Sequence, residues 1–164
     1  METHNLRPEP LTPAGFAPYG TVIADTADGQ LFGPDEAQLE LSAGAPRFYI
    51  MALERRPSHI PVLTRHRHVT QCLASVGGQE WFIVVAPPDS SDEPEAVPDA
   101  SLIRAFRIPG NVGIMLNRGT WHAGPLFEAE IASFFNLELT DTNQVDHHSV
   151  NLRKLFGVEY RLQI

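Results

Sequence analysis

The stretch Thr64-Arg-His-Arg-His-Val-Thr-Gln71 carries the most informative pattern in this chain, because it sets two histidines two positions apart. We expect it to lie inside a strand that covers residues 62–75. Successive side chains on a strand point to opposite faces, so His66 and His68 are expected to be neighbours on one face. Two neighbouring neutral imidazoles suit a transition metal.

A second stretch, Gly113-Ile-Met-Leu-Asn-Arg-Gly-Thr-Trp-His122, reads as a strand, a glycine turn and a histidine that follows the turn. His122 is therefore the natural third ligand, from a different strand. Three histidines leave coordination positions open for a substrate. We predict a metal site of His66, His68 and His122. Gln71 would complete it if a bulge or turn aimed its amide inward.

The rest of the chain favours short strands over long helices. Fourteen prolines and twelve glycines are scattered along it, and no long amphipathic segment stands out. Thr12 is a plausible helix N-cap with Pro13 at the first helical position, which predicts a short helical turn. Frequent strands and turns predict an all-β sandwich or barrel. The strand candidates are residues 47–55, 62–75, 80–86, 102–108, 113–116 and 132–139.

Three connections have distinct compositions. Gly77-Gly78 supplies the positive φ angles of a tight hairpin, between a strand that ends near Val76 and one that starts near Trp81. Residues 25–46 are acidic and punctuated by glycine, and we interpret them as an arm or loop. Residues 87–99 are polar and rich in proline, which predicts an exposed loop.

Composition excludes several classes of protein. A length of 164 residues fits a single domain over residues 1–164, and a net charge of -8 argues against a nucleic-acid partner. Cys72 is the one cysteine, so no intrachain disulfide forms. No segment approaches the roughly 20 apolar residues of a membrane helix, which makes a cytoplasmic protein the default. No phosphate-binding glycine loop or nucleophile elbow is present.

Further polar residues are candidates for the same site. Glu138 lies two residues from Asn136 on a late strand and could act as a general base or as a fourth ligand. Arg118 could bind a substrate carboxylate, or it could be an exposed turn residue. Trp121 fits core packing or a pocket wall that contacts substrate. His147 and His148 fit loop structure or a subunit contact.

The two histidine stretches resemble the two motifs of the cupin family. The first is similar to the cupin His-X-His element, with Gln71 in place of the usual later glutamate. The second is similar to the Pro-X-Gly-X-X-His element, with Asn117 where proline is usual. The resemblance implies a cupin-type double-stranded β-helix, a jelly-roll barrel with short flanking helical turns.

A closer resemblance is to the ureidoglycolate lyase family, itself cupin-like. It rests on residues 11–23, Arg65-His66, Thr70-Gln71, residues 82–87 and residues 118–122. The resemblance implies that His66, Gln71, Arg118 and His122 are pocket residues. His68 and Ala123 depart from the family pattern, which has an apolar residue and a second histidine there. These departures indicate a divergent branch.

The resemblance implies a metal-assisted lyase that splits ureidoglycolate, or a related ureido or hydroxy carboxylate, into glyoxylate and urea. A divalent Ni, Mn, Fe or Zn ion on the three histidines would polarise a substrate oxygen. Arg118 would hold the carboxylate, and Glu138 or a metal-bound hydroxide would move the proton. The alternatives are an Fe(II) dioxygenase and a non-catalytic binding protein. We expect a homodimer.

Overall fold

Short strands joined by turns make up most of the chain in the computed structural model, which describes residues 1–89 and 92–164. The brief helical elements are α1 (Pro13–Phe16), η1 (Ala100–Leu102), α2 (Thr142–Val145) and α3 (Leu152–Phe156). The strands are β1 (Glu2–Leu6), β2 (Glu9–Pro10), β3 (Gly20–Ile23), β4 (Pro46–Glu54), β5 (His59–Ile60), β6 (Val62–Arg65), β7 (Gln71–Ser75), β8 (Trp81–Ala86), β9 (Arg104–Ile108), β10 (Gly113–Leu116), β11 (Trp121–Leu126), β12 (Ile131–Leu139), β13 (His148–Asn151) and β14 (Val158–Leu162).

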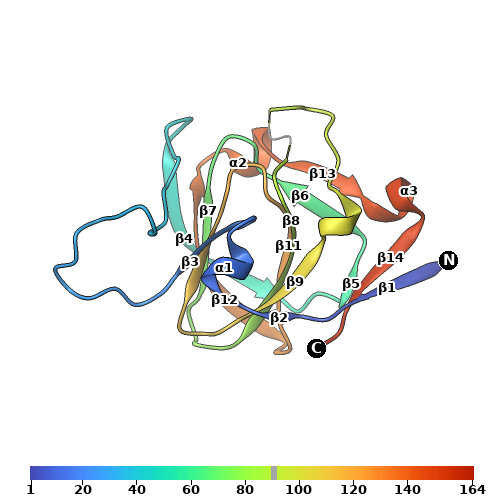
Figure 1. Cartoon of the computed structure of the whole chain (residues 1–164), viewed down its shortest axis with the longest axis horizontal. Coiled ribbons are helices and arrows are strands. Elements are labelled where there is room, and N and C mark those ends of the chain that lie inside the picture. Colours follow the sequence, from blue (N-terminus) through green and yellow to red (C-terminus); the bar gives the residue numbers. More distant parts are fainter. Residues whose placement is uncertain (90–91) are drawn as a thin grey trace.

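Two sheets face each other and form the barrel (Figure 1). One has five strands in the order β3-β10-β7-β12-β4, and the other has six in the order β13-β6-β11-β8-β9-β2. A smaller sheet, β1-β14-β5, covers part of the outer side of the six-stranded sheet. The all-β, cupin-type barrel with short flanking helical turns that the sequence predicts is confirmed.

The main core lies between the two large sheets. Phe16 of α1 closes one side, while Trp81 and Phe134 from opposite sheets meet edge to face at 5.2 Å between ring centroids. All three side chains are fully buried. Each large apolar side chain of this kind stabilises the fold by about 1.5–3 kcal/mol. A second core joins the six-stranded sheet to the small sheet.

The expected continuous strand over residues 62–75 is wrong. β6 ends at Arg65 and belongs to the six-stranded sheet, whereas β7 begins at Gln71 in the five-stranded sheet. Residues 66–70 therefore carry the chain from one sheet to the other. The expected hairpin at Gly77-Gly78 is also wrong, although Gly78 does adopt a φ of 77°. The turn connects strands in two different sheets, because β7 and β8 do not pair.

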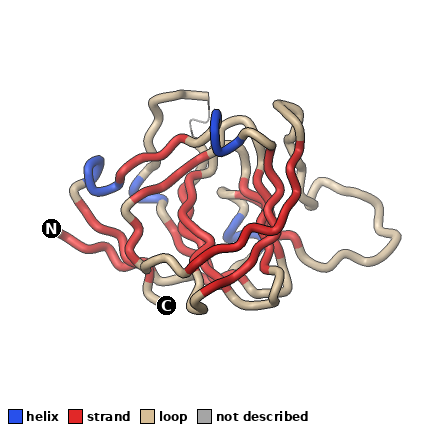
Figure 2. The backbone as a smooth tube through the Cα atoms, turned by 180° about the vertical axis from the view of Figure 1, so that it is seen from behind, coloured by secondary structure: helices blue, strands red, loops and turns tan. Residues whose placement is uncertain are grey.

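Several local predictions are confirmed. The Thr12 hydroxyl accepts a hydrogen bond from the Gly15 backbone N–H at 3.0 Å and so caps α1. Residues 24–45 form an arm without strands, as expected for 25–46, and it stands out from the barrel (Figure 2). Among the residues that the structure describes, no helix has the length and apolar character needed to cross a membrane.

Candidate functional site

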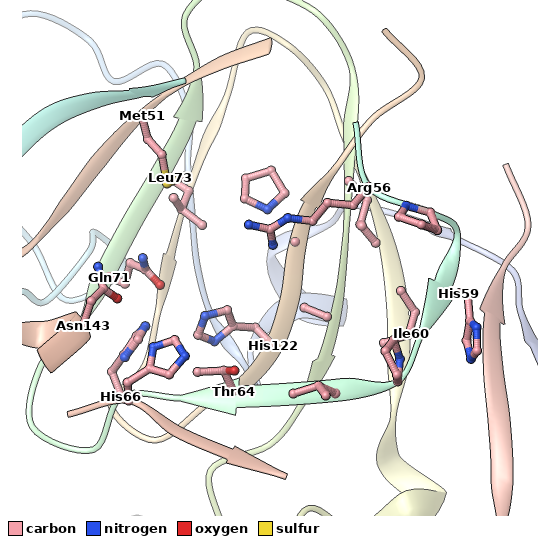
Figure 3. Close-up of a pocket in the computed structure, with 18 residues that line it drawn as sticks. Met51, Arg56, His59, Ile60, Thr64, His66, Gln71, Leu73, His122 and Asn143 are labelled. Carbon is pink, nitrogen blue, oxygen red and sulfur yellow. The ribbon is translucent and has the colours of Figure 1, made fainter. Parts of the chain in front are cut away.

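A cavity of about 480 Å³ lies inside the barrel between the facing sheets (Figure 3). Its walls come from β4 and β7 on one side and from β6 and β11 on the other. Met51 and Leu73 contribute apolar surface. Its polar and charged lining includes Arg56, His66, Gln71, His122 and His147.

His66 is held by Asp146. The His66 ring Nδ1 lies 2.7 Å from the Asp146 backbone carbonyl oxygen, and a carbonyl oxygen can only accept a hydrogen bond. Nδ1 therefore carries the proton, and Nε2 keeps a free lone pair. His66 is buried, and desolvation lowers the pKa of its imidazole, although the nearby Asp146 opposes that change. The ring is a neutral donor of an electron pair at neutral pH.

His122 has the same tautomer for the same reason. Its Nδ1 lies 3.1 Å from the Thr120 carbonyl oxygen, which leaves Nε2 as the acceptor. Desolvation, followed by the neighbouring His66, lowers the pKa of His122 to about 3. The His66 and His122 ring centroids are 5.2 Å apart. The cavity thus holds two neutral imidazoles, and each carries its proton on Nδ1.

His68 is exposed and stands outside the cavity lining, so the predicted His66–His68 pair does not form. The two-residue alternation of a strand fails here because β6 has already ended at Arg65. The Asp146 carboxylate instead accepts hydrogen bonds from the backbone N–H groups of Arg67 at 2.8 Å and His68 at 2.9 Å. These bonds fix a bend at which only His66 turns into the barrel.

His147 is the third imidazole of the cavity, with its ring centroid 5.7 Å from that of His66. The sequence suggested loop structure or a subunit contact for this residue. Its real position depends on the segment after β12, which returns to the barrel and adds β13 beside β6. No pattern in the sequence around His147 indicates this position, because it depends on pairing between segments far apart in the chain.

Gln71 lies at the start of β7 with its amide buried beside the two imidazoles. Its Nε2 donates to Asn136 Oδ1 at 3.1 Å. Within the described part of the chain, its Oε1 is buried without a hydrogen-bond partner. Leaving a buried acceptor unpaired costs about 1–3 kcal/mol, so this oxygen is suited to a cation or a substrate donor.

Donor atoms at the histidine end of the cavity suit a metal ion. In residues 1–89 and 92–164, no group of three or more His, Cys, Asp or Glu side chains is arranged to hold a metal ion. His66, His122 and Gln71 are a different set, two imidazoles and an amide oxygen, and they line one small recess of the barrel. The free Nε2 atoms and the unpaired Oε1 give three lone pairs. This set fits a divalent metal with open positions.

Glu138 lies behind the cavity wall. It is buried, and its Oε1 accepts hydrogen bonds from Tyr49 at 3.0 Å and Asn143 at 3.2 Å. Asn136 donates to the same Tyr49 hydroxyl at 3.2 Å, so Tyr49 and Asn136 link Glu138 to Gln71 through three hydrogen bonds. Glu138 therefore supports the site from behind the cavity lining. A general base or a metal ligand would have to lie in the lining, and Glu138 does not.

Arg118 and Trp121 also lie outside the lining. Arg118 donates to the Arg67 carbonyl oxygen at 3.1 Å and pairs with Glu40 at 3.5 Å, on the outside of the barrel. Trp121 is buried in the second core beneath the Arg65 guanidinium, which lies 4.7 Å from its ring centroid. The turn that brings His122 into the cavity directs the side chains of Arg118 and Trp121 away from the cavity.

Arg56 is the cationic residue of the cavity, and the sequence patterns did not single it out. It follows β4 and extends its guanidinium into the cavity toward His122 (Figure 3). Its positive charge contributes to the lowered pKa of His122. A guanidinium in this place suits a carboxylate group of a small molecule.

Comparison with known proteins identifies relatives along most of the chain. The family model described as ureidoglycolate lyase matches residues 3–159. The ureidoglycolate lyase of Pseudomonas fluorescens is 33% identical over 154 residues, which cover 85% of this chain and 88% of the relative. That of Azotobacter vinelandii is 33% identical over 127 residues, or 70% and 72% of the two chains. Among solved structures, oxalate decarboxylase from Bacillus subtilis at pH 4.6 aligns with a TM-score of 0.39 and 13% identity, over 78% of this chain and 36% of that one.

Proposed function

The chain belongs to the ureidoglycolate lyase family, and we propose that its cavity cleaves the C–N bond of ureidoglycolate or of a closely related ureido hydroxy acid. The products would be glyoxylate and urea. The observation that carries this proposal is the convergence of two neutral imidazoles and one guanidinium on one cavity. A cavity of about 480 Å³ accommodates a molecule of this size.

Arg56 binds the substrate carboxylate in this proposal. A guanidinium donates two parallel hydrogen bonds to a carboxylate, which fixes both the position and the orientation of the acid. The remaining carbinol and ureido groups then point toward the histidine end of the cavity. Arg118 cannot take this part, because Glu40 and the Arg67 carbonyl oxygen hold it outside.

His147 acts as the general base in this proposal. It lines the cavity and, unlike His66 and His122, is exposed to water. It takes the proton from the carbinol hydroxyl, and the oxygen forms the carbonyl of glyoxylate as the C–N bond breaks. The electron pair of that bond stays on the departing nitrogen. The imidazolium returns the proton to that nitrogen, which releases neutral urea.

His66, Gln71 and His122 would hold a divalent ion. A bound ion would act as a Lewis acid on the hydroxyl oxygen, lowering its pKa. Without the ion, the Gln71 Oε1 accepts a hydrogen bond from a ureido N–H and orients the leaving group. Each free histidine Nε2 has one lone pair, so His66 cannot both ligate a metal and accept the substrate proton.

The same proposal covers the domain organisation, the oligomeric state and the localisation of the chain. We take the chain to act as one domain, as a homodimer and in the cytoplasm. The substrate is a small, water-soluble anion. Its recognition by Arg56 requires neither a membrane surface nor a nucleic acid.

The test is product analysis by NMR under anaerobic conditions, with racemic ureidoglycolate and the purified protein. We expect glyoxylate and urea in equal amounts. Arg56→Ala should raise KM by about 10-fold to 100-fold, because a charge-assisted hydrogen-bond pair is lost. Arg55→Ala is the matched control, since Arg55 donates to the Glu128 carbonyl oxygen at 2.9 Å and is outside the lining. Products that form only with oxygen would overturn the lyase assignment, and equal effects of the two variants would remove Arg56 from the site.

A further inference from the structure

The six-stranded sheet opens beside the cavity, at the point where β6 and β11 stop pairing. Within the described residues, the ladder between these two strands consists of Thr64 opposite His122. Three positions along in the same register, Pro61 would face Pro125. Proline has no backbone N–H and cannot donate to a sheet ladder. The ladder therefore ends here, and the cavity extends between the two segments.

Apolar side chains line both sides of this opening, which we call the apolar end of the cavity. They are Ile60, Pro61, Val62, Pro125 and Leu126. Val62 faces the cavity as Thr64 does, because side chains alternate along β6 and Leu63 between them packs into the second core. Val62 is 37% exposed, so its apolar surface is available to a ligand.

Arg56 stands between the apolar end and the histidines. Figure 3 shows Ile60 and His59 on the far side of the Arg56 guanidinium from His66 and Gln71. Among the described residues that line the cavity, none is Asp, Glu or Lys. A carboxylate bound to Arg56 would thus have polar groups on one side and aliphatic surface on the other.

The cavity is larger than ureidoglycolate. The roughly nine non-hydrogen atoms of this acid fill at most about 270 Å³, even if each takes the roughly 30 Å³ that a water molecule occupies in the liquid. The cavity measures about 480 Å³. The space that remains is sufficient for a short aliphatic chain, and the apolar end is the part of the cavity whose surface suits one.

We propose that the apolar end binds an alkyl substituent on the carbinol carbon of the substrate. This inference rests on the proposed C–N cleavage and names a narrower class of substrate for it. The carbinol carbon of ureidoglycolate bears the carboxylate, the hydroxyl, the ureido nitrogen and one hydrogen. With the carboxylate on Arg56, and the hydroxyl and the nitrogen toward the histidines, the fourth bond points away from the histidines. An alkyl group in place of that hydrogen enters the apolar end.

The substituent leaves the bonds that form and break unchanged. The hydroxyl loses its proton, its oxygen forms a carbonyl, and the C–N bond breaks with its electron pair on the nitrogen. That nitrogen takes up a proton, and urea leaves. The other product is a 2-oxo acid with a short alkyl chain in place of glyoxylate. Ureidoglycolate reacts less efficiently, because it leaves the apolar end unfilled and loses that binding energy.

The affinities of two 2-oxo acids test the apolar end without any turnover. Pyruvate and 2-oxohexanoate share the carboxylate and the ketone and differ by three methylene groups. Each fully buried methylene group tightens binding by about 4-fold. We expect the wild-type protein to bind 2-oxohexanoate at least about 10-fold more tightly than pyruvate in NMR titrations.

Two variants at one position test whether Val62 contributes to this preference. Val62→Asn replaces apolar surface by an amide of similar size, whereas Val62→Trp fills the apolar end. Each should reduce the preference for 2-oxohexanoate at least about 3-fold and change pyruvate binding less than about 2-fold, because Arg56 still holds the carboxylate. Val97→Asn and Val97→Trp are the matched controls, since Val97 is 50% exposed and lies outside the lining. Circular dichroism checks that each variant is folded.

Turnover tests the substrate class separately. The analogue of ureidoglycolate with a butyl group on its carbinol carbon should release urea with a kcat/KM at least about 10-fold above that of ureidoglycolate. Equal affinities for the two 2-oxo acids would overturn the apolar end even if ureidoglycolate is cleaved, as would a preference that both Val62 variants leave intact. Tighter binding of 2-oxohexanoate without urea from either substrate would instead overturn the proposed reaction and leave the apolar end as a binding site.

Discussion

Asp146 holds the His66 ring through its backbone carbonyl and holds the two residues after His66 through its side chain. The Asp146 carbonyl oxygen fixes the tautomer of His66 at 2.7 Å, while its carboxylate holds the two backbone N–H groups that follow His66. One residue thus sets both the proton position of the imidazole and the bend that delivers it into the barrel. Orienting partners of this kind are as important as the functional side chain itself.

Replacement of Asp146 by alanine should therefore damage both stability and the site. Two backbone N–H groups lose their acceptor, which should lower the free energy of unfolding by about 2–3 kcal/mol. The variant keeps the backbone carbonyl at position 146, but the bend that carries His66 into the barrel loses its anchor, which should reduce kcat more than it raises KM. Urea denaturation and steady-state kinetics measure the two effects. Asp141→Ala is the control, because Asp141 makes no side-chain capping bond to α2, and an equal loss there would contradict this role.

Two kinds of variant test the metal site. One kind removes a donor, and the other removes His68, the predicted ligand that lies outside the cavity. His122→Ala and Gln71→Leu should each weaken binding of added Ni²⁺ or Zn²⁺ by at least about 10-fold, because each removes a lone pair from the recess. His68→Ala should change the affinity less than about 2-fold, since an exposed side chain away from the recess contributes no ligand. Isothermal titration calorimetry gives the affinities. Strong loss of binding in His68→Ala would restore the triad of His66, His68 and His122.

Stability of the metal-free protein should depend on pH through His122. The pKa of its imidazole is about 3 in the folded chain, whereas an unfolded histidine has a pKa of about 6.5. The unfolded state therefore binds more protons between these values, so the free energy of unfolding should rise from about pH 3 to pH 6.5 and then level off. At pH 5 the deficit from His122 is about 2 kcal/mol relative to neutral pH.

The lowered pKa of His66 acts in the same direction. His122→Gln should thus flatten the pH dependence without abolishing it. Chemical denaturation at pH 5 and pH 7.5, with a chelator present, measures both proteins. An unchanged slope in the variant would show that His122 is charged in the folded state.

The Tyr49 hydroxyl should stabilise the buried side chain of Glu138. It donates to Glu138 at 3.0 Å, and within the described residues the other carboxylate oxygen, Oε2, is buried without a partner. Tyr49→Phe should lower the free energy of unfolding by about 1–3 kcal/mol, since a buried carboxyl oxygen loses a hydrogen-bond donor. Combining it with Glu138→Ala should give less than the sum of the two single effects, because both variants break the same contact. Additive effects in thermal or chemical denaturation would contradict this coupling.

The sequence was sufficient for the barrel and for two of the three predicted histidines. Short strands, scattered turns and the glycine turn before His122 are local features, and local features carried those predictions. The placement of His68 failed because it rested on strand alternation across residues 62–75, and β6 stops at Arg65. That stop depends on Asp146, which is 80 positions away from His66 in the chain.

Long-range pairing also explains the residues that the sequence did not identify. Arg56 and His147 reach the cavity because β4 pairs with β12 and β13 pairs with β6. No spacing within their own segments shows this. Arg118 and Glu138 were chosen by chemical type, which does not reveal whether a side chain is held by other partners. Glu40 and Tyr49 are the partners that remove them from the cavity.

The most direct test of the proposed lyase site is the rate of urea release from ureidoglycolate under anaerobic conditions by the wild-type protein, His122→Ala and His68→Ala. We predict turnover by the wild type and by His68→Ala at rates within about 2-fold, with a fall of at least about 100-fold in folded His122→Ala. No urea from the wild type, or full activity in folded His122→Ala, would contradict the assignment of this cavity as the site of C–N cleavage.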